Sequence, residues 1–154
     1  MQTFPFNSLN LLVKPLNLPA KFHLQVASDL TALTQVLTWF EQAYTDNIPK
    51  KEWLQCQLAL AEGFTNAVRH AHRDLPSDTP IDLEVQLYPQ QITIRIWDSG
   101  FPFDLEQHIA NLSLKPDYQA GGGRGIALMY KIADDLTYQR TEGDRNCLTL
   151  VKTW

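Results

Sequence analysis

The chain has 154 residues, the size of one typical domain. Apolar residues make up 44% of it and charged residues 19%, which is typical of a folded globular protein and argues against disorder. Seventeen acidic residues against thirteen Lys and Arg give a formal charge of −4, and no segment is basic. Nucleic acid and anionic membrane surfaces are therefore disfavoured as direct ligands, since both require clustered cations.

The sequence carries neither a membrane-spanning run nor a secretory signal. No apolar run approaches the ~20 residues that cross a membrane, and the first residues lack a basic start followed by an apolar core. Cys56 and Cys147 form no spaced pair, and the four histidines make no HExxH motif, so a zinc site is not expected. We expect a reduced, cytoplasmic protein with both cysteines in its core.

The first third of the chain predicts an arm, a strand and a helix. Residues 1–20 are rich in Leu, Asn and Pro, and we interpret them as an irregular arm ahead of one domain at 21–154. Apolar and polar residues alternate over 21–27, which predicts a half-buried strand. Ser28 is the expected N-cap of an amphipathic helix over about 29–45.

The rest of the chain predicts one layer of helices on one sheet. A helix over about 49–72 starts with proline in its first turn. Strict alternation over 81–88 and 92–97, joined by a short turn, predicts a hairpin. The remaining expected elements are a short helix at about 104–110, a loop at 111–123, a helix at about 124–135, and strands near 136–141 and 146–153. Together they predict an α/β (α+β) two-layer sandwich, with a mostly antiparallel mixed sheet and helices on one face.

The helix at 49–72 is apolar on nearly all sides and should be buried, yet it carries one polar stripe. Glu62, Asn66 and His70 lie at positions i, i+4 and i+8. Burying such groups unpaired costs several kcal/mol, so the stripe must face something polar. It is either a structural network on one face or a functional pair, with Glu62 as a base beside an Asn66 carbonyl that ligates Mg²⁺.

A second polar feature is Asp98, at the end of the second hairpin strand. Strand parity places its carboxylate on the face that the helices cover. The Asp98-Ser99-Gly100 sequence is compatible with a simple Asx-turn. It is equally compatible with a carboxylate that accepts a hydrogen bond from the amine of adenine, with Gly100 allowing the ring to approach the backbone.

A third feature is a glycine cluster that opens the helix at 124–135. Residues 121–125 read GGGRG, and free N–H groups at a helix start favour anions such as phosphate. The cluster lacks the lysine of a Walker loop and does not match GxGxxG, so neither a P-loop nor a Rossmann site is expected.

The order of these features resembles the GHKL ATPases, the superfamily of the Bergerat nucleotide-binding fold. Residues 62–71 (EGFTNAVRHA) are similar to the N box of the anti-sigma-factor serine kinases, the RsbW-like branch. Residues 98–104 (DSGFPFD) resemble that branch's DxGxPFD motif. Residues 122–128 (GGRGIAL) resemble its GGRGLxL motif, and 148–152 (LTLVK) resemble its closing strand. The resemblance covers roughly residues 21–154.

The sequence departs from the family pattern at a few positions. Gly63 stands where alanine usually follows the base, which weakens the helix slightly. Ala127 replaces the third glycine of the last motif, and Pro102 stands where the wider superfamily has glycine, although proline is common in this branch. Residues 1–20 match no part of the family pattern that we can assign.

The resemblance implies a site for ATP and Mg²⁺. Asp98 would hold adenine above Gly100, Asn66 would ligate Mg²⁺ that bridges the phosphates, and Glu62 would be the general base. His70 would support these groups rather than catalyse. The loop at 111–125 would be a lid, whose residues nearest the phosphates would be Gly123, Arg124 and Gly125.

The resemblance also implies a function. Family kinases phosphorylate a serine or threonine on a STAS-domain anti-anti-sigma protein and bind a sigma factor, so phosphorylation decides which partner is bound. A homodimer is compatible with this interpretation. The alternatives are a non-catalytic ATP-binding module that sequesters a regulator, and the catalytic half of a sensor histidine kinase. The last is disfavoured, because 20 residues ahead of the first strand are too few for a dimerisation helix with a phospho-accepting histidine.

Overall fold

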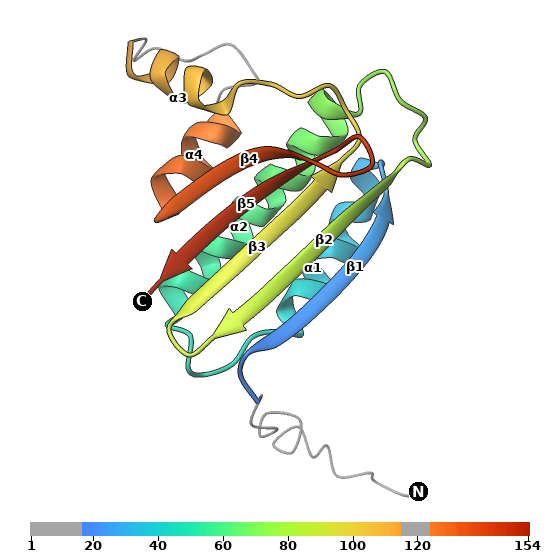
Figure 1. Ribbon diagram of the computed structural model, residues 1–154. Coiled ribbons are helices and arrows are strands. Elements are labelled where there is room, and N and C mark those ends of the chain that lie inside the picture. The colour runs from blue at the N-terminus through green and yellow to red at the C-terminus, as the bar shows by residue number, and fades with distance from the viewer. Residues whose placement is uncertain (1–16, 115–123) are drawn as a thin grey trace, which may run out of the picture.

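The structure is a computed structural model that describes residues 17–114 and 124–154. Most of the expected arm and part of the expected lid, including Gly123, lie outside the described residues. Figure 1 shows the elements in chain order. They are β1 (Ala20–Ala27), a 3-10 turn (Leu30–Ala32), α1 (Leu33–Glu41), α2 (Lys50–Asn66) continued by a π-helical turn (Ala67–Ala71), β2 (Pro80–Tyr88), β3 (Gln91–Asp98), α3 (Leu105–Leu114), α4 (Arg124–Ile132), β4 (Asp135–Thr141) and β5 (Arg145–Thr153).

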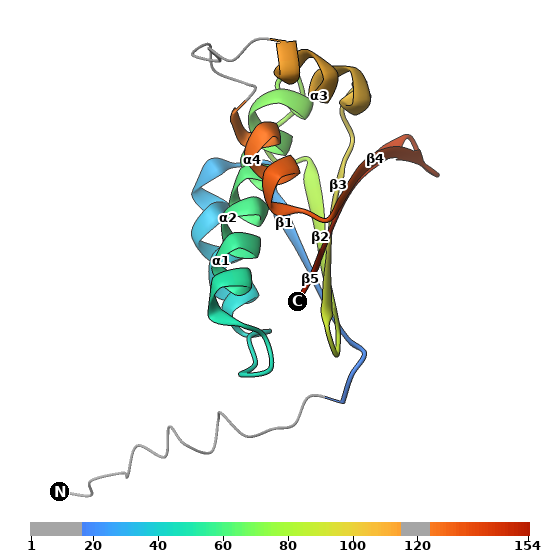
Figure 2. The same cartoon turned by 90° about the vertical axis from the view of Figure 1, so that its left-hand side faces the viewer.

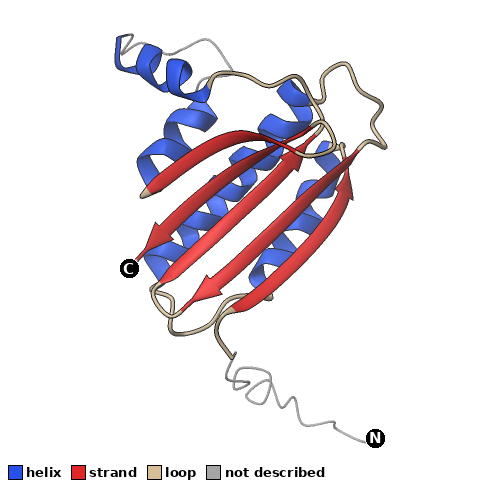
Figure 3. Ribbon diagram, viewed as in Figure 1, coloured by secondary structure: helices blue, strands red, loops and turns tan. Residues whose placement is uncertain are grey.

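The strands form one five-stranded sheet in the order β1-β2-β3-β5-β4. The sheet expected to be mostly antiparallel is antiparallel in all four of its pairings. Helices α1, α2 and α4 lie against one face, and the opposite face carries no helix of the described chain (Figures 2 and 3). The predicted α+β sandwich is therefore confirmed. Within the described residues, no helix combines the length and apolar character needed to cross a membrane.

The core lies between the sheet and its helices. Ile94 of β3 pairs with Val85 of β2, and both are almost fully buried, as the alternation in the sequence predicts. On the helix side, Phe40 of α1 stacks on Trp53 of α2 with ring centroids 4.0 Å apart, and both side chains are fully buried. This pair packs α1 against α2.

The expected helix at 29–45 differs from the structure at both ends. Its N-cap is Asp29 rather than Ser28, because the Asp29 side chain accepts a hydrogen bond from the Thr31 N–H at 2.9 Å. Ser28 instead extends the strand pairing, as its N–H donates to Thr79 O at 3.0 Å. The first turn is 3-10, and the α-helix ends at Glu41.

The face of the sheet opposite helices α1, α2 and α4 carries charged and polar side chains, which water can hydrate. Glu84 lies between Lys21, at 3.1 Å, and Arg95, at 2.9 Å. Asp82 is bonded to Arg145 and to the Gln25 amide. Cross-strand pairs of opposite charge are the favourable arrangement on such a surface.

Gly63 of α2 lies where the helix touches the sheet most closely. A Cβ at this position would lie 2.5 Å from Ile96 Cδ1 and 3.4 Å from Met129 Sδ. The glycine that replaces the family's alanine therefore leaves space that Ile96 fills.

We expect Gly63→Ala to lower the free energy of unfolding, since overpacking a core costs about 1–3 kcal/mol. In an Ile96→Val background, which lacks Cδ1, the same change should be neutral or stabilising by up to about 1 kcal/mol, the helix propensity difference. Urea unfolding of the wild type, Gly63→Ala, Ile96→Val and the double variant measures the coupling energy between the two positions. A coupling energy near zero would show that the close contact has no energetic consequence.

Candidate functional site

Polar side chains meet at one end of the sheet, where β3 ends and β5 begins. Strand register places Asp98 opposite Asn146, and Asn146 opposite Arg140 of β4. Asp98 is only 4% exposed and Asn146 is fully buried. A carboxylate and an amide removed from water in this way need hydrogen-bond partners.

Asp98 has three donors. Its Oδ1 accepts from the Gly100 N–H at 2.9 Å and from Asn146 Nδ2 at 2.8 Å, and its Oδ2 accepts from the Tyr138 hydroxyl at 3.1 Å. The Asx-turn is therefore present, but it accounts for only one of these bonds. Burial and the Asp98 charge raise the pKa of Tyr138 above its ordinary value, so its hydroxyl remains a donor.

Gly100 has a packing role that the sequence does not predict. A Cβ at this position would overlap the carbonyl oxygen of Ala71. The loop after β3 therefore touches the backbone of the π-helical turn, and only glycine permits that approach. The role of Gly100 beneath a bound nucleotide stays a prediction.

The π-helical turn also selects the histidine that reaches the Asp98 loop. The His72 N–H donates to Ala67 O at 2.8 Å, the i→i−5 bond of a π-helix. His72 is 3% exposed, and its Nε2 accepts from the Ser99 N–H at 2.8 Å. His70 is exposed and its expected supporting role stays a prediction, whereas His72 is the histidine that contacts the loop after β3. The cause is the one-residue insertion of the π turn, which the polar stripe does not reveal.

Glu62 and Asn66 meet the first turn of α4. A Cβ on Gly125 would lie 2.7 Å from Glu62 Oε2 and 3.1 Å from Asn66 Nδ2. Gly125 is thus required by the close approach of the two helices. Asn66 Nδ2 is buried without a hydrogen-bond partner among the described residues. A buried polar atom of this kind fits a site that a ligand completes.

The donor set around Asn66 fits Mg²⁺. The Asn66 amide supplies a carbonyl oxygen, the type of ligand that hard cations prefer. Within the described residues no group of three or more His, Cys, Asp or Glu could hold a metal ion alone. Mg²⁺ commonly takes one or two protein oxygens and completes its shell with water and phosphate. Arg124, exposed at the start of α4, lies at the helix end that favours anions.

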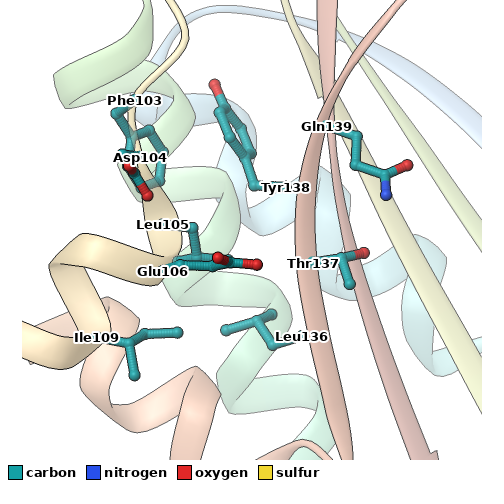
Figure 4. Close-up of a pocket in the computed structure, with 9 residues that line it drawn as sticks. All are labelled: Phe103, Asp104, Leu105, Glu106, Ile109, Leu136, Thr137, Tyr138 and Gln139. Atoms are coloured by element: carbon teal, nitrogen blue, oxygen red, sulfur yellow. The ribbon is translucent and has the colours of Figure 1, made fainter.

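A groove of about 370 Å³ adjoins the Asp98 network (Figure 4). The loop after β3 and the start of α3 form one wall, and the edge strand β4 forms the other. The rings of Phe103 and Tyr138 lie 4.4 Å apart at one end of it. Tyr138 both lines the groove and bonds Asp98, so it links the groove to the buried carboxylate. The lining residues are Phe103, Asp104, Leu105, Glu106, Ile109, Leu136, Thr137, Tyr138 and Gln139.

Four site residues escape the sequence analysis: His72, Tyr138, Arg140 and Asn146. The last three lie on β4 and β5, on the same side of the sheet as Asp98. That they share this side can be recognised only when the register between strands distant in sequence is known. The one signal that Asn146 offers is that a short polar residue shares the strand parity of Leu148 and Leu150 in β5.

The chain belongs to the histidine kinase-like ATPase domain family, because the model of that family matches residues 26–152. The match contains all the site residues described above. It confirms the superfamily that the motifs of the sequence indicate.

Within this family the chain is similar to serine-protein kinases named RsbW. The protein of Listeria innocua is 32% identical over 92 residues, which is 56% of this chain and 58% of that protein. The protein of Staphylococcus epidermidis is 30% identical over 92 residues, which is again 56% of this chain and 58% of that protein. The match thus spans less than two thirds of the curated relatives' length.

A solved structure shares the fold. The crystal structure of the SiaB-SiaC complex from Pseudomonas aeruginosa contains a similar chain, with a TM-score of 0.55. The likeness covers 86% of this chain and 89% of that one, at 9% sequence identity. At this identity it describes the architecture alone.

The His72 environment predicts a pH dependence of stability. Burial lowers the pKa of His72 below its ordinary value of about 6.5, although the Asp98 charge opposes this. As the pH falls, His72 is therefore protonated more readily in the unfolded chain than in the folded chain. The free energy of unfolding should decrease as the pH drops through about 6.5. In His72→Gln, where an amide oxygen can still accept from Ser99, the loss between pH 7.5 and 5.5 should be smaller.

Urea unfolding at the two pH values measures this difference. His70→Gln is the matched control, because His70 is exposed on the same turn, and it should keep the pH dependence of the wild type. The same dependence in His72→Gln and wild type would contradict the assignment.

Proposed function

We propose that this chain is an ATP-dependent serine/threonine protein kinase that phosphorylates a STAS-domain anti-anti-sigma protein. It also binds a sigma factor, and phosphorylation decides which partner is bound. The observation that carries the proposal is the contact of Gly125 with both Glu62 and Asn66. This contact sets a carboxylate and an amide beside the helix end at which phosphates bind. The name of the RsbW relatives, serine-protein kinase, supports the same activity.

Each site residue has a defined task in this proposal. Asp98 accepts a hydrogen bond from the amine of adenine, because its Oδ2 has one bond and can take a second. Asn66 offers its carbonyl oxygen to Mg²⁺, which neutralises phosphate charge when bound. Gly125 and Arg124, at the start of α4, contact the phosphates in this proposal, and Gly123, which lies outside the described residues, is assigned to phosphate binding by the motif alone.

Glu62 is the general base of the proposed reaction. Its carboxylate accepts the proton of the serine or threonine hydroxyl as that oxygen bonds to the γ-phosphorus of ATP, while the bond from that phosphorus to the β–γ bridging oxygen breaks and ADP leaves. Phosphoryl transfer depends mainly on positioning and charge stabilisation. One carboxylate, one metal ion and the proposed lid are therefore sufficient for this reaction. The π-helical turn connects this catalytic half to the base-binding half, because it begins after Asn66 and touches Gly100 at Ala71.

Asn66→Ala tests the metal-ligand role. We expect ATP affinity to fall about tenfold or more with Mg²⁺ present, which corresponds to at least ~1.4 kcal/mol. With EDTA the loss should be less than about twofold, because the missing contact is to the ion. Calorimetric titration in the two conditions measures both values. An equal loss in both would make Asn66 a structural residue.

Glu62→Gln separates an enzyme from a binding module. The amide is nearly isosteric and keeps an acceptor oxygen, so folding, ATP affinity and partner binding should survive. Proton acceptance should not, and general-base catalysis typically contributes 10²–10⁴-fold. We expect transfer of labelled phosphate to a co-purified STAS-type partner to fall at least about a hundredfold.

Two outcomes of that assay would be decisive. Wild-type rates in Glu62→Gln would refute the base. A wild-type chain that binds its partner yet transfers no phosphate to it would favour the sequestering module. Glu52→Gln, on the same helix but about three turns before Glu62, is the matched control and should transfer phosphate at the wild-type rate.

A further inference from the structure

We propose that Asn146 is a positioning residue that sets the purine selectivity of the nucleotide site, and that Arg140 fixes the orientation of its amide. The inference rests on the proposed function, because it requires the base of ATP to lie against Asp98. It concerns a residue outside every motif that the sequence analysis identifies.

The orientation of the Asn146 amide is determined by its partners. Its Nδ2 donates to Asp98 Oδ1 at 2.8 Å and to Gly100 O at 2.9 Å, while its Oδ1 accepts from Arg140 Nη1 at 3.1 Å. A guanidinium only donates, and a carboxylate and a carbonyl only accept. The reversed amide would therefore lose all three bonds inside a fully buried environment. Arg140 Nη1 also donates to Gly100 O at 3.3 Å.

The bonds to Asp98 leave one of its oxygens available. Each carboxylate oxygen accepts about two hydrogen bonds. Oδ1 already accepts from Asn146 and Gly100, whereas Oδ2 accepts from Tyr138 alone. Oδ1 therefore has two donors, one of them Asn146, and Oδ2, which accepts from Tyr138, keeps one acceptor position.

An acceptor in that position distinguishes purines by the group on C6. An amine donates to Oδ2, as in ATP, whereas a carbonyl would place two acceptors against each other, as in ITP. A site built to bond one polar group rejects the analogue that lacks it. Without the Asn146 donor, the carboxylate can rotate or bind a proton, and either change allows Asp98 to accommodate a C6 carbonyl.

A purely structural role makes a different prediction. Asn146 also bonds Gly100 and so ties the loop to β5. Loss of that tie alone would weaken ATP and ITP equally and leave their ratio unchanged. The ratio of the two dissociation constants therefore isolates the positioning role.

The experiment measures Mg²⁺-dependent ATP and ITP binding by calorimetry in the wild type and in variants of the full chain. We expect the wild type to prefer ATP at least about tenfold. Asn146→Leu should reduce that preference to within about threefold. Asn146→Thr, whose hydroxyl can still donate to Asp98, should retain most of it. Glu142→Gln is the matched control, because Glu142 is exposed in the turn that joins β4 to β5 and its replacement should leave the preference unchanged.

The outcomes separate this inference from the function on which it rests. A wild type that binds neither nucleotide overturns both. A wild type that binds ATP and ITP equally, or an Asn146→Leu variant that keeps the wild-type preference, overturns the selectivity role and leaves ATP binding intact.

A measurement on the wild type covers the case in which Asn146→Leu does not fold. The side-chain amide signals of Asn146 in a ¹⁵N-labelled chain, assigned by their absence in Asn146→Thr, should shift on addition of ATP and not of ITP. An equal response to both nucleotides, or no response to either, would contradict the inference.

Discussion

The buried carboxylate of Asp98 is the constraint on which the rest of the site depends. A charge that is 4% exposed is costly unless donors surround it. The chain supplies those donors from three places, the loop at Gly100, β4 at Tyr138 and β5 at Asn146. The order β3-β5-β4 makes this convergence possible, because it brings the last two strands beside the end of β3. The closing hairpin therefore completes the site as well as the sheet.

The π-helical turn joins this network to the proposed catalytic pair. It follows Asn66 directly, packs Ala71 against Gly100 and leads to His72, which bonds the Ser99 backbone. Insertions of this kind occur frequently at functional sites. Because α2 carries Glu62 and Asn66 on one turn, a shift of that helix would move the proposed base and the Asp98 loop together. The two halves of the site are thus parts of one packed unit.

The sequence predicts what depends on local periodicity and known motifs. Strand parity correctly orients Asp98 toward the helix-covered face, and the motif order identifies the family. Register between distant strands has no local signal, so Asn146 and Tyr138 become site residues only in the structure. The π turn is likewise invisible to a 3.6-residue pattern, so the contact of His72 with the loop after β3 becomes apparent only in the structure.

The most direct test of the account is a calorimetric titration of wild type and Asp98→Asn with ATP and Mg²⁺. Asparagine keeps the shape of the side chain and can still accept from Gly100 and Asn146, but it presents an amide donor at the Oδ2 position. Loss of a charged hydrogen bond is worth about 1.5–3 kcal/mol, so affinity should fall about ten- to a hundredfold. Equal affinity in the two proteins would contradict the claim that Asp98 binds the nucleotide base.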